Sequence, residues 1–367
     1  MKFTVARKEI ADALKFVNKA CAVKSNTPIL SGIYLSAAES RLEMQATDNT
    51  VGIIAKIPVN VEESGATVLI GKYFLEIISK LTGGTVTIST NENFAEISSE
   101  GTKYNLLKLD AEDFPKIRQE ENLQTFTLSQ KKLKNLIRRT YFSADFSKDA
   151  SRPIFTGALF KLDGEKLTLA ATNIHRLAVM SEKVSAPIDE VKFLVPAKIL
   201  QEISAMLGDD GEIEINYTGK TANFIFANYL VTARLIAGIY PPFERLLNEE
   251  KNIFATVEVA EFKNALERVA IIAKESEYET VALKFADNEL KISATSLSIG
   301  KAEEFISAEI DGGELEIAFN VNYWLDVLKV LDAEKIVIGL TKPLAPVDVK
   351  IVGDDSFHYV VTPVRRS

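Results

Sequence analysis

The chain has 367 residues, and its 43 Lys and Arg against 51 Asp and Glu give a formal net charge of −8 at pH 7. Hydrophobic residues make up 47% and charged residues 26%, which is typical of globular proteins and excludes wholesale disorder. One cysteine (Cys21) and two histidines (His175 and His358) exclude an intrachain disulfide, a multi-thiolate zinc site and a three-histidine metal centre. This composition indicates a reducing, cytoplasmic compartment, and we expect no targeting segment and no membrane span.

A weak internal repeat is the most informative feature of the chain. Three stretches alternate apolar and polar residues and end in Ala-Thr: residues 42–47 (LEMQAT), 167–172 (LTLAAT) and 290–295 (LKISAT). Their final threonines are 125 and 123 residues apart. The alternation predicts half-buried strands, and turn-rich steps such as residues 162–165 predict hairpins before them. Each unit is expected to close with a strand that opens on Tyr104, Tyr229 or Tyr359.

The repeat also predicts two helices in each unit. An amphipathic helix comes near the start of each, with Ile10, Leu14 and Val17 on one face of the first. A shorter helix follows in each, at residues 71–81, 196–207 and 320–331. We therefore expect an α+β fold of three domains, residues 1–118, 125–247 and 253–367, each with two helices packed on antiparallel sheets. Polar links at 119–122 and 248–252 join them.

Positive charge is concentrated on the first helix of each unit although the chain is acidic. The helix expected from 129 to 142 carries five Lys and Arg and no acidic residue, and Lys131, Lys134 and Arg138 share one of its faces. One interpretation is an ordinary solvated helix face. The other is a surface that binds the nucleic-acid backbone without reading its sequence. Recurrence of basic helices in equivalent positions strengthens the second interpretation, and both stay open at this point.

The sequence contains no recognisable catalytic motif. The nearest approach to a phosphate-binding loop is Gly71-Lys72, but Ala66 stands in place of its first glycine and Tyr73 follows the lysine. His175 follows a predicted strand without a candidate nucleophile or metal cluster beside it in sequence. Cys21, between two alanines at a helix end, is expected to be a small core residue. We therefore expect no catalytic site, no metal and no cofactor.

Several segments together resemble a known family. They are residues 172–178 (TNIHRLA), the Tyr240-Pro241-Pro242-Phe243 corner with Arg245, the tail 359–365 (YVVTPVR) and the early 27–30 (TPIL). With the three repeats, they make the whole chain similar to the bacterial DNA polymerase III beta subunit family, the beta sliding clamps. The resemblance implies a homodimer whose six similar domains assemble head to tail into a ring. Helices would line a hole around duplex DNA and strands would form the outer layer, giving a processivity factor without a catalytic site.

The resemblance also implies three groups of functional residues. Those facing DNA would be Lys24, Lys131, Lys134, Arg138, Lys198 and Lys263. A peptide-binding pocket between the second and third domains would be lined by Arg152, Phe155, Thr172, His175, Arg176, Leu177, Pro241, Arg245, Leu246, Tyr323, Leu344, Pro346, Val360, Val361, Thr362, Pro363, Val364 and Arg365. The dimer interface would contain Phe74, Ile77, Ile78, Lys103, Leu106 and Leu107 on one side and Ile271, Ile272, Glu303 and Glu304 on the other.

The implied partners are duplex DNA, a second copy of the chain, the DNA polymerase III alpha subunit and the clamp loader delta subunit. Other polymerases and repair proteins that carry clamp-binding peptides would use the same pocket, and no membrane is implied. Within the pocket, apolar side chains would form the groove, and His175, Arg176 and the other arginines would donate to peptide carbonyls. For Val360 and Val361, the residues alone favour a core strand.

The sequence departs from the family pattern at three places. Asn173-Ile174 replaces the usual Asp-Gly or Asp-Ser before the histidine, Pro153-Ile154 stands where some clamps carry aromatic residues, and Arg366-Ser367 extends the tail. Two other functions stay open at this point. An enzyme could use Asp, Glu and His175, and a monomeric DNA-binding scaffold could carry the same basic helices without closing a ring.

Overall fold

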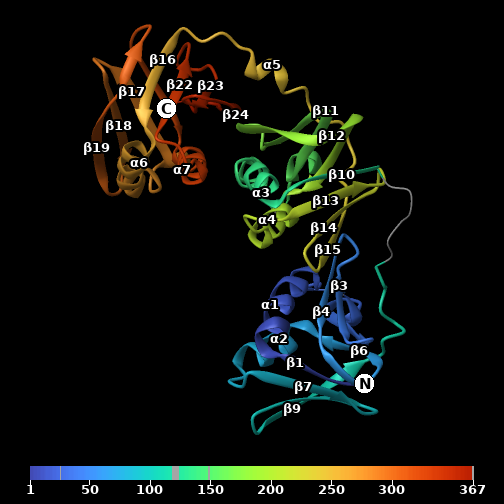
Figure 1. Ribbon diagram of the computed structural model, residues 1–367. Helices are drawn as coiled ribbons and strands as arrows, with labels where there is room; N and C mark the ends of the chain where they lie inside the picture. The colour runs from blue at the N-terminus through green and yellow to red at the C-terminus, as the bar shows by residue number, and fades with distance from the viewer. Residues whose placement is uncertain (25, 118–123, 148, 366–367) are drawn as a thin grey trace. The chain divides into compact units, whose positions relative to one another are not determined.

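The computed structural model describes residues 1–367 apart from 25, 118–123, 148 and 366–367 (Figure 1). The expected link at 119–122 and the Arg366-Ser367 tail therefore lie outside the described residues. The chain divides into two compact units, which are described separately. Unit 1 comprises Met1–Lys134 and Glu202–Leu235, and unit 2 comprises Asn135–Gln201 and Ile236–Ser367. The division falls inside two helices, α3 (Gln130–Arg138) and α4 (Ala197–Met206).

Unit 1 is built on one 13-stranded antiparallel sheet with the order β10-β13-β14-β15-β4-β3-β2-β6-β9-β8-β7-β1-β5. Its strands are β1 (Lys2–Ala6), β2 (Gly32–Ala38), β3 (Arg41–Thr47), β4 (Val51–Pro58), β5 (Asn60–Glu63), β6 (Gly65–Ile70), β7 (Thr85–Thr90), β8 (Phe94–Ser99), β9 (Thr102–Leu109), β10 (Gln124–Ser129), β13 (Glu212–Tyr217), β14 (Thr221–Phe226) and β15 (Tyr229–Arg234). Helices α1 (Arg7–Val17) and α2 (Gly71–Lys80) pack on each other, and α1 also packs on β3 and β4. The predicted apolar face of α1 is confirmed, because Ile10, Leu14 and Val17 are fully buried.

Unit 2 contains a seven-stranded sheet, β11-β12-β24-β23-β22-β16-β20, and a four-stranded sheet, β19-β18-β17-β21, both antiparallel. The strands are β11 (Gly157–Thr172), β12 (Arg176–Pro196), β16 (Ile253–Glu258), β17 (Thr280–Ala286), β18 (Glu289–Ser296), β19 (Gly300–Ser307), β20 (Glu309–Asp311), β21 (Leu315–Asn320), β22 (Lys335–Leu340), β23 (Val347–Ile351) and β24 (Asp354–Val361). Helices α6 (Val259–Ala273) and α7 (Val321–Val330) pack together, and a short helix α5 (Glu244–Leu247) precedes them. Trp324 of α7 is fully buried, with its ring 5.3 Å from that of Phe262.

The repeated Ala-Thr pair ends a strand with a specific turn. The Thr47 hydroxyl donates to the carbonyl of Val51 at 2.8 Å, and the Thr172 hydroxyl donates to the carbonyl of Arg176 at 2.6 Å. In both turns the same hydroxyl also accepts the amide two residues later, from Asn49 or Ile174. In these two turns one hydroxyl closes the turn in both directions, whereas in the third repeat β18 continues past Thr295 and the Ser296 hydroxyl accepts the amide of Ser298.

The α+β fold class is confirmed, with helices packed on antiparallel sheets, but several expected bounds are wrong. Helix α3 ends at Arg138 rather than 142, and a 3₁₀ turn at Tyr141–Ser143 follows it. Strand β11 continues through 162–165, where a turn was expected, because irregularities in its pairing with β12 absorb Gly164. Tyr229 opens its strand as predicted, whereas Tyr104 and Tyr359 lie inside theirs.

Candidate functional site

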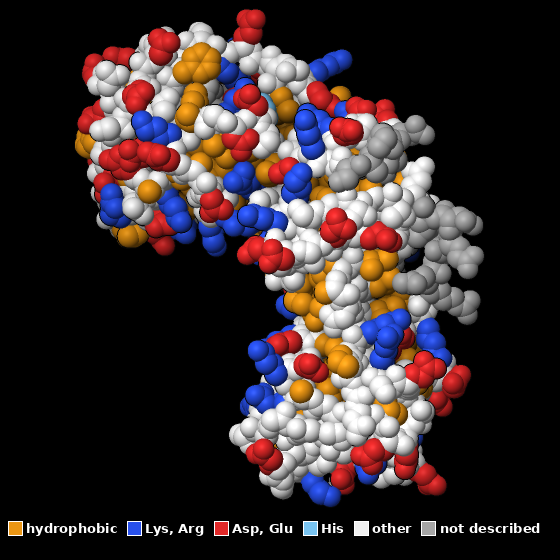
Figure 2. Space-filling model, in the orientation of Figure 1, with side chains coloured by type: hydrophobic (Ala, Val, Ile, Leu, Met, Phe, Trp, Pro, Cys, Tyr) orange, Lys and Arg blue, Asp and Glu red, His pale blue; other side chains and the backbone are white. Residues whose placement is uncertain are grey.

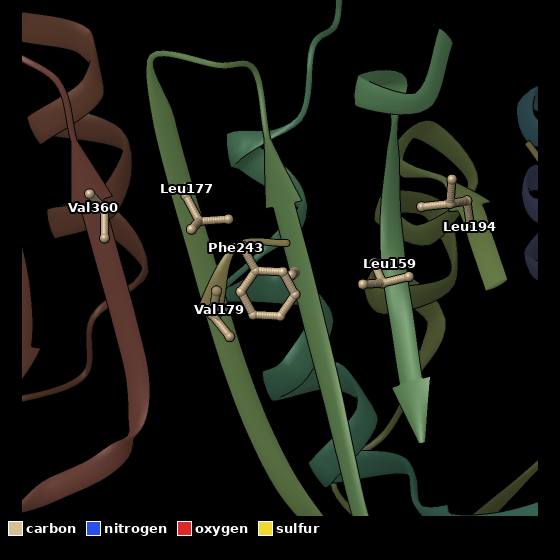
Figure 3. Close-up of a cluster of buried hydrophobic side chains, with 7 residues drawn as sticks. Leu159, Leu177, Val179, Leu194, Phe243 and Val360 are labelled. Carbon is tan, nitrogen blue, oxygen red and sulfur yellow. The ribbon is translucent and has the colours of Figure 1, made fainter. Parts of the chain in front are cut away.

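A cluster of apolar side chains lies where β12 pairs with β24 in unit 2. Leu177 of β12 is directly opposite Val360 of β24, so the two side chains project from the same face of the sheet. This face is called the outer face below. Both side chains are buried in one cluster with Leu159, Ala170, Val179, Leu194 and Phe243. Figure 3 shows the Phe243 ring among the side chains of β11 and β12, with Val360 on the neighbouring strand.

The segment from 236 to 252, called the connector below, supplies Phe243 to this cluster. The Tyr240 hydroxyl donates to the carbonyl of Ala170 at 3.3 Å, and burial raises the pKa of Tyr240 well above its usual value. Its ring packs edge-on against both Phe155 and Phe243, with centroids 6.4 Å away in each case. The connector therefore lies on the outer face as a packed segment rather than as a free loop.

Arg176 makes contacts within unit 2 that the sequence did not predict, and its role as a donor to peptide carbonyls stays a prediction. Its side chain is 9% exposed, and its guanidinium lies 2.6 Å from Asp326 of α7 and donates to the carbonyl of Phe142 at 2.6 Å. It also lies over the Tyr323 ring, 4.8 Å from the centroid. These contacts join β12 to α7, because a buried guanidinium needs partners of this kind, while its buried Nε has no hydrogen-bond partner among the described residues.

His175 lies exposed in the turn between β11 and β12. Its backbone carbonyl accepts the amide of Thr362 at 2.9 Å and the hydroxyl of the same residue at 3.0 Å. Its ring is nearly parallel to that of Tyr323, at a centroid distance of 6.4 Å. The turn thus places His175 beside the chain that follows β24, although 187 residues separate it from Thr362.

All residues expected to line the peptide pocket lie in unit 2, but they do not all offer side chains to a ligand. The exposed ones are Arg152, His175, Pro241, Arg245, Leu246, Leu344 and Arg365, and those of intermediate burial are Tyr323, Pro346, Thr362, Pro363 and Val364. The buried ones are Phe155, Thr172, Arg176, Leu177, Val360 and Val361. The core-strand interpretation of Val360 and Val361 is confirmed, and Val361 shares the opposite face of the sheet with Arg176.

Sequence reasoning missed Phe243 and Asp326 as parts of this region. Phe243 was predicted only as part of a corner motif, and its burial among Leu177, Val179 and Val360 shows that it completes the cluster. The connector holds several large apolar residues, so its sequence did not single out Phe243. Asp326 gave no signal, because an acidic residue on a helix is ordinarily solvated.

The predicted DNA-facing residues differ in how far their charge is already neutralised. Lys134 lies 3.5 Å from Asp209, and Arg138 lies 2.6 Å from Asp332. Among the described residues, no acidic group forms an ion pair with Lys131, Lys198 or Lys263, and these three are called the free lysines below. Lys24 is exposed in the loop after α1. Figure 2 shows Lys and Arg side chains over the helices of each unit, interspersed with acidic ones.

Two strand edges in the predicted dimer regions have no strand partner within the described chain. In unit 1, β9 pairs with β8 over Thr102–Leu107 but reaches β6 only at Lys108 and Leu109, so the 102–107 edge is open. In unit 2, β19 is the outermost strand of the four-stranded sheet and pairs with β18 alone. Leu107 is 68% exposed on the first edge and Phe305 is 53% exposed on the second. Open edges with apolar side chains are typical of surfaces that pair with another chain.

Part of the predicted dimer surface is wrong. Phe74 and Ile78 are fully buried beneath α2, so their side chains belong to the core of unit 1. Ile77 and Leu106 are partly accessible, and on α6 Ile271 is exposed and Ile272 partly so. The charged candidates already have partners within the chain: Lys103 with Glu96, Glu303 with Lys291 and Glu304 with Arg268.

No group of three or more His, Cys, Asp or Glu side chains among the described residues is arranged to hold a metal ion. In the part of the chain that the structure describes, no helix has both the length and the apolar character to cross a membrane. Burial raises the pKa of the Cys21 thiol to about 12, consistent with the expected small core residue.

Comparisons with known proteins cover the whole chain. Sequence profiles of the DNA polymerase III beta subunit match its N-terminal domain at residues 1–118, its central domain at 127–242 and its C-terminal domain at 244–365. The beta sliding clamp of Staphylococcus aureus strain Mu50 is 32% identical over 376 residues, covering 100% of this chain and 99% of that protein.

Solved structures give the same result. The DNA polymerase sliding clamp of Bacillus subtilis superposes with a TM-score of 0.93 at 32% identity. A sliding clamp of Pseudomonas aeruginosa bound to griselimycin superposes with a TM-score of 0.93 at 27% identity. Both alignments cover 100% of each chain. On these matches, the chain belongs to the DNA polymerase III beta subunit family, the beta sliding clamps.

Proposed function

We propose that the protein is a cytoplasmic processivity factor that acts in DNA replication as a closed homodimeric ring around duplex DNA. Each chain contributes three domains, residues 1–118, 125–247 and 253–367, and six domains complete the ring. The ring slides without reading sequence and tethers the DNA polymerase III alpha subunit. It carries no catalytic site of its own.

The pair of open strand edges is the observation that carries this proposal. The β9 edge at 102–107 and the β19 edge lie in different units. Pairing the β9 edge of one chain with the β19 edge of a second chain therefore makes a head-to-tail contact. Two such contacts related by a twofold axis close a ring and leave neither edge exposed. Leu106 and Leu107 on β9, and Ile271 and Ile272 on α6, which packs against β19, supply apolar surface near these edges, and accessible Ile77 of α2 is a further candidate.

The free lysines support contact with the DNA backbone. A ring holds DNA by topology, so its lining needs only weak attraction to phosphates. Lys131, Lys198 and Lys263 are available for this, together with exposed Lys24, whereas Lys134 and Arg138 share their charge with acidic neighbours. Such a lining favours sliding, because no single phosphate is bound tightly.

We assign peptide binding to the surface around His175 in unit 2. Exposed His175 lies beside Thr362 after β24, α5 with exposed Leu246 lies against β24, and exposed Leu344 is in the β22–β23 loop. Short segments of the alpha subunit, the clamp loader delta subunit, other polymerases and repair proteins are its proposed occupants.

Small-angle X-ray scattering at several concentrations tests the ring. A mass near twice the 40.5 kDa of one chain, with a distance distribution that contains a central void, supports it. A monomer that persists at the highest concentration would leave a DNA-binding scaffold as the better description. The enzyme alternative is tested separately: His175→Ala should weaken binding of the alpha subunit, with no reaction to lose.

A further inference from the structure

The connector is fastened to unit 2 near both of its ends. At its start, the amide of Ile236 donates to the carbonyl of Leu194 at 2.9 Å. Lys161 of β11 lies 2.9 Å from Glu244, and this hydrogen bond lowers the pKa of the Glu244 carboxyl. At its end, the amide of Asn252 donates to the carbonyl of Leu340 at 3.1 Å. The side chain of Lys251 makes the last contact before Asn252 that holds the connector on unit 2.

Lys251 is unusual because its charged side chain is only 6% exposed. Its ammonium donates to the backbone carbonyl of Pro346 at 3.0 Å and lies 3.3 Å from the Glu249 carboxylate. Burial of an ammonium is unfavourable unless hydrogen bonds and an opposite charge compensate it, so these contacts fix where the group lies. Lys251 therefore joins the connector to the loop between β22 and β23, across 95 residues of sequence.

Gly339 makes room for this side chain. A Cβ at position 339 would lie 2.9 Å from Cγ of Lys251, closer than real Cβ contacts allow. Gly339 on β22 pairs with Asp348 on β23, which pairs with Val360 on β24, so all three positions share the outer face. The Lys251 stem thus lies against Gly339 on β22, two strands from Val360 of the apolar cluster.

The charge of Lys251 also acts on Asp348. Burial raises the pKa of the Asp348 carboxyl, and the positive charges of Lys350, His358 and Lys251 oppose that rise without cancelling it. The Asp348 side chain is 9% exposed and lies 3.6 Å from Lys350. A buried carboxylate close to the Lys251 ammonium favours keeping that ammonium in place.

We propose that Lys251 is a positioning residue for the peptide-binding surface, a proposal that rests on the function proposed above. One wall of that surface, with Arg245 and Leu246, belongs to the connector. We assign the second wall, with Leu344 and Pro346, to the β22–β23 loop. The Lys251–Pro346 hydrogen bond ties the two walls together, so it sets the width of the surface before a peptide arrives. A preset width reduces the conformational entropy that the surface loses when a peptide binds.

The test compares three variants of the full-length protein. Lys251→Met keeps the stem and removes the donor, and Gly339→Ala displaces the stem and keeps the charge. Lys335→Met is the matched control, because Lys335 is also on unit 2 and loses an ion pair of 3.1 Å to Glu309, away from both walls. Hydrogen exchange is measured without ligand, and affinity is measured for the purified DNA polymerase III alpha subunit.

We expect amides in 244–250 and 341–346 to exchange at least about tenfold faster in the first two variants, and the alpha subunit to bind about tenfold more weakly, equivalent to ~1.4 kcal/mol. The control should match wild type in both measurements. A merely structural role would instead speed exchange throughout unit 2, beyond the two segments, and would lower affinity only through loss of folded protein.

If amides in 244–250 and 341–346 exchange at the wild-type rate in both variants, the Lys251–Pro346 hydrogen bond does not hold the two walls together. Faster exchange with unchanged affinity would overturn the positioning role. Failure of the wild-type protein to bind the alpha subunit would contradict the proposed function instead, and the exchange rates would then decide the tie by themselves.

Discussion

Ile174 occupies a backbone conformation that is unfavourable for its side chain. Its φ is 79°, in the left-handed region, where β-branched residues are true outliers. The equivalent position of the unit 1 turn is Asn49, with φ of 72°, and asparagine tolerates this region. For an ordinary L-residue the left-handed conformation costs about 1–2 kcal/mol. The turn before His175 therefore holds strain that its counterpart after Thr47 does not.

We predict that Ile174→Asn is more stable than Ile174→Thr by about 1–2 kcal/mol. Both substitutions give up the same apolar contact, because Ile174 is 56% exposed and each replacement is small and polar. Only threonine keeps the β-branch, so the difference between the two free energies of unfolding isolates the strain.

The free energies of unfolding are measured by urea titration, monitored by the fluorescence of the single tryptophan. Trp324 is fully buried in unit 2, the unit that contains Ile174, so its emission reports the relevant transition. Equal stability of the Asn and Thr variants would refute the reasoning, because it would show that the β-branch carries no cost at this φ.

Three further predictions concern charge and association. The stability of Asp348→Asn relative to wild type should increase as the pH rises from about 4 through the raised pKa of Asp348, because the folded wild-type protein resists ionisation of this carboxyl and the unfolded chain does not. Thermal unfolding at several pH values checks this, and a stability difference that does not change with pH would contradict it. Leu107→Asp should shift the protein toward monomer in sedimentation, because a charge enters an apolar edge that is 68% exposed; an unchanged mass would count against the β9 edge. Replacing each free lysine by Ala should lower the slope of log affinity for duplex DNA against log salt by about 0.9; an unchanged slope would remove these residues from the DNA surface.

Local patterns predicted most of the elements. The spacing of Ile10, Leu14 and Val17 predicted α1, because a helix packed on a sheet must bury one face. The Ala-Thr pairs located strand ends in units 1 and 2, because the threonine hydroxyl closes the turn. These features depend on neighbours within a few residues, so the sequence displays them directly.

The errors came from contacts between residues far apart in sequence. Arg176 was predicted to donate to peptide carbonyls, but its contacts with Asp326 of α7 and with the Phe142 carbonyl in the turn after α3 were not predicted. Phe74 and Ile78 were assigned to a dimer surface, but they are the buried face of α2. A helix pattern identifies the apolar face without saying whether its own chain or another covers it.

The central claim is that the protein holds DNA by encircling it. The direct measurement is retention on a covalently closed DNA circle compared with the same DNA after linearisation, with the protein loaded by its clamp loader and washed in high salt. We expect the protein to remain on the circle and to leave from the ends of the cut DNA. Equal retention, or equal loss, on both forms would contradict the ring.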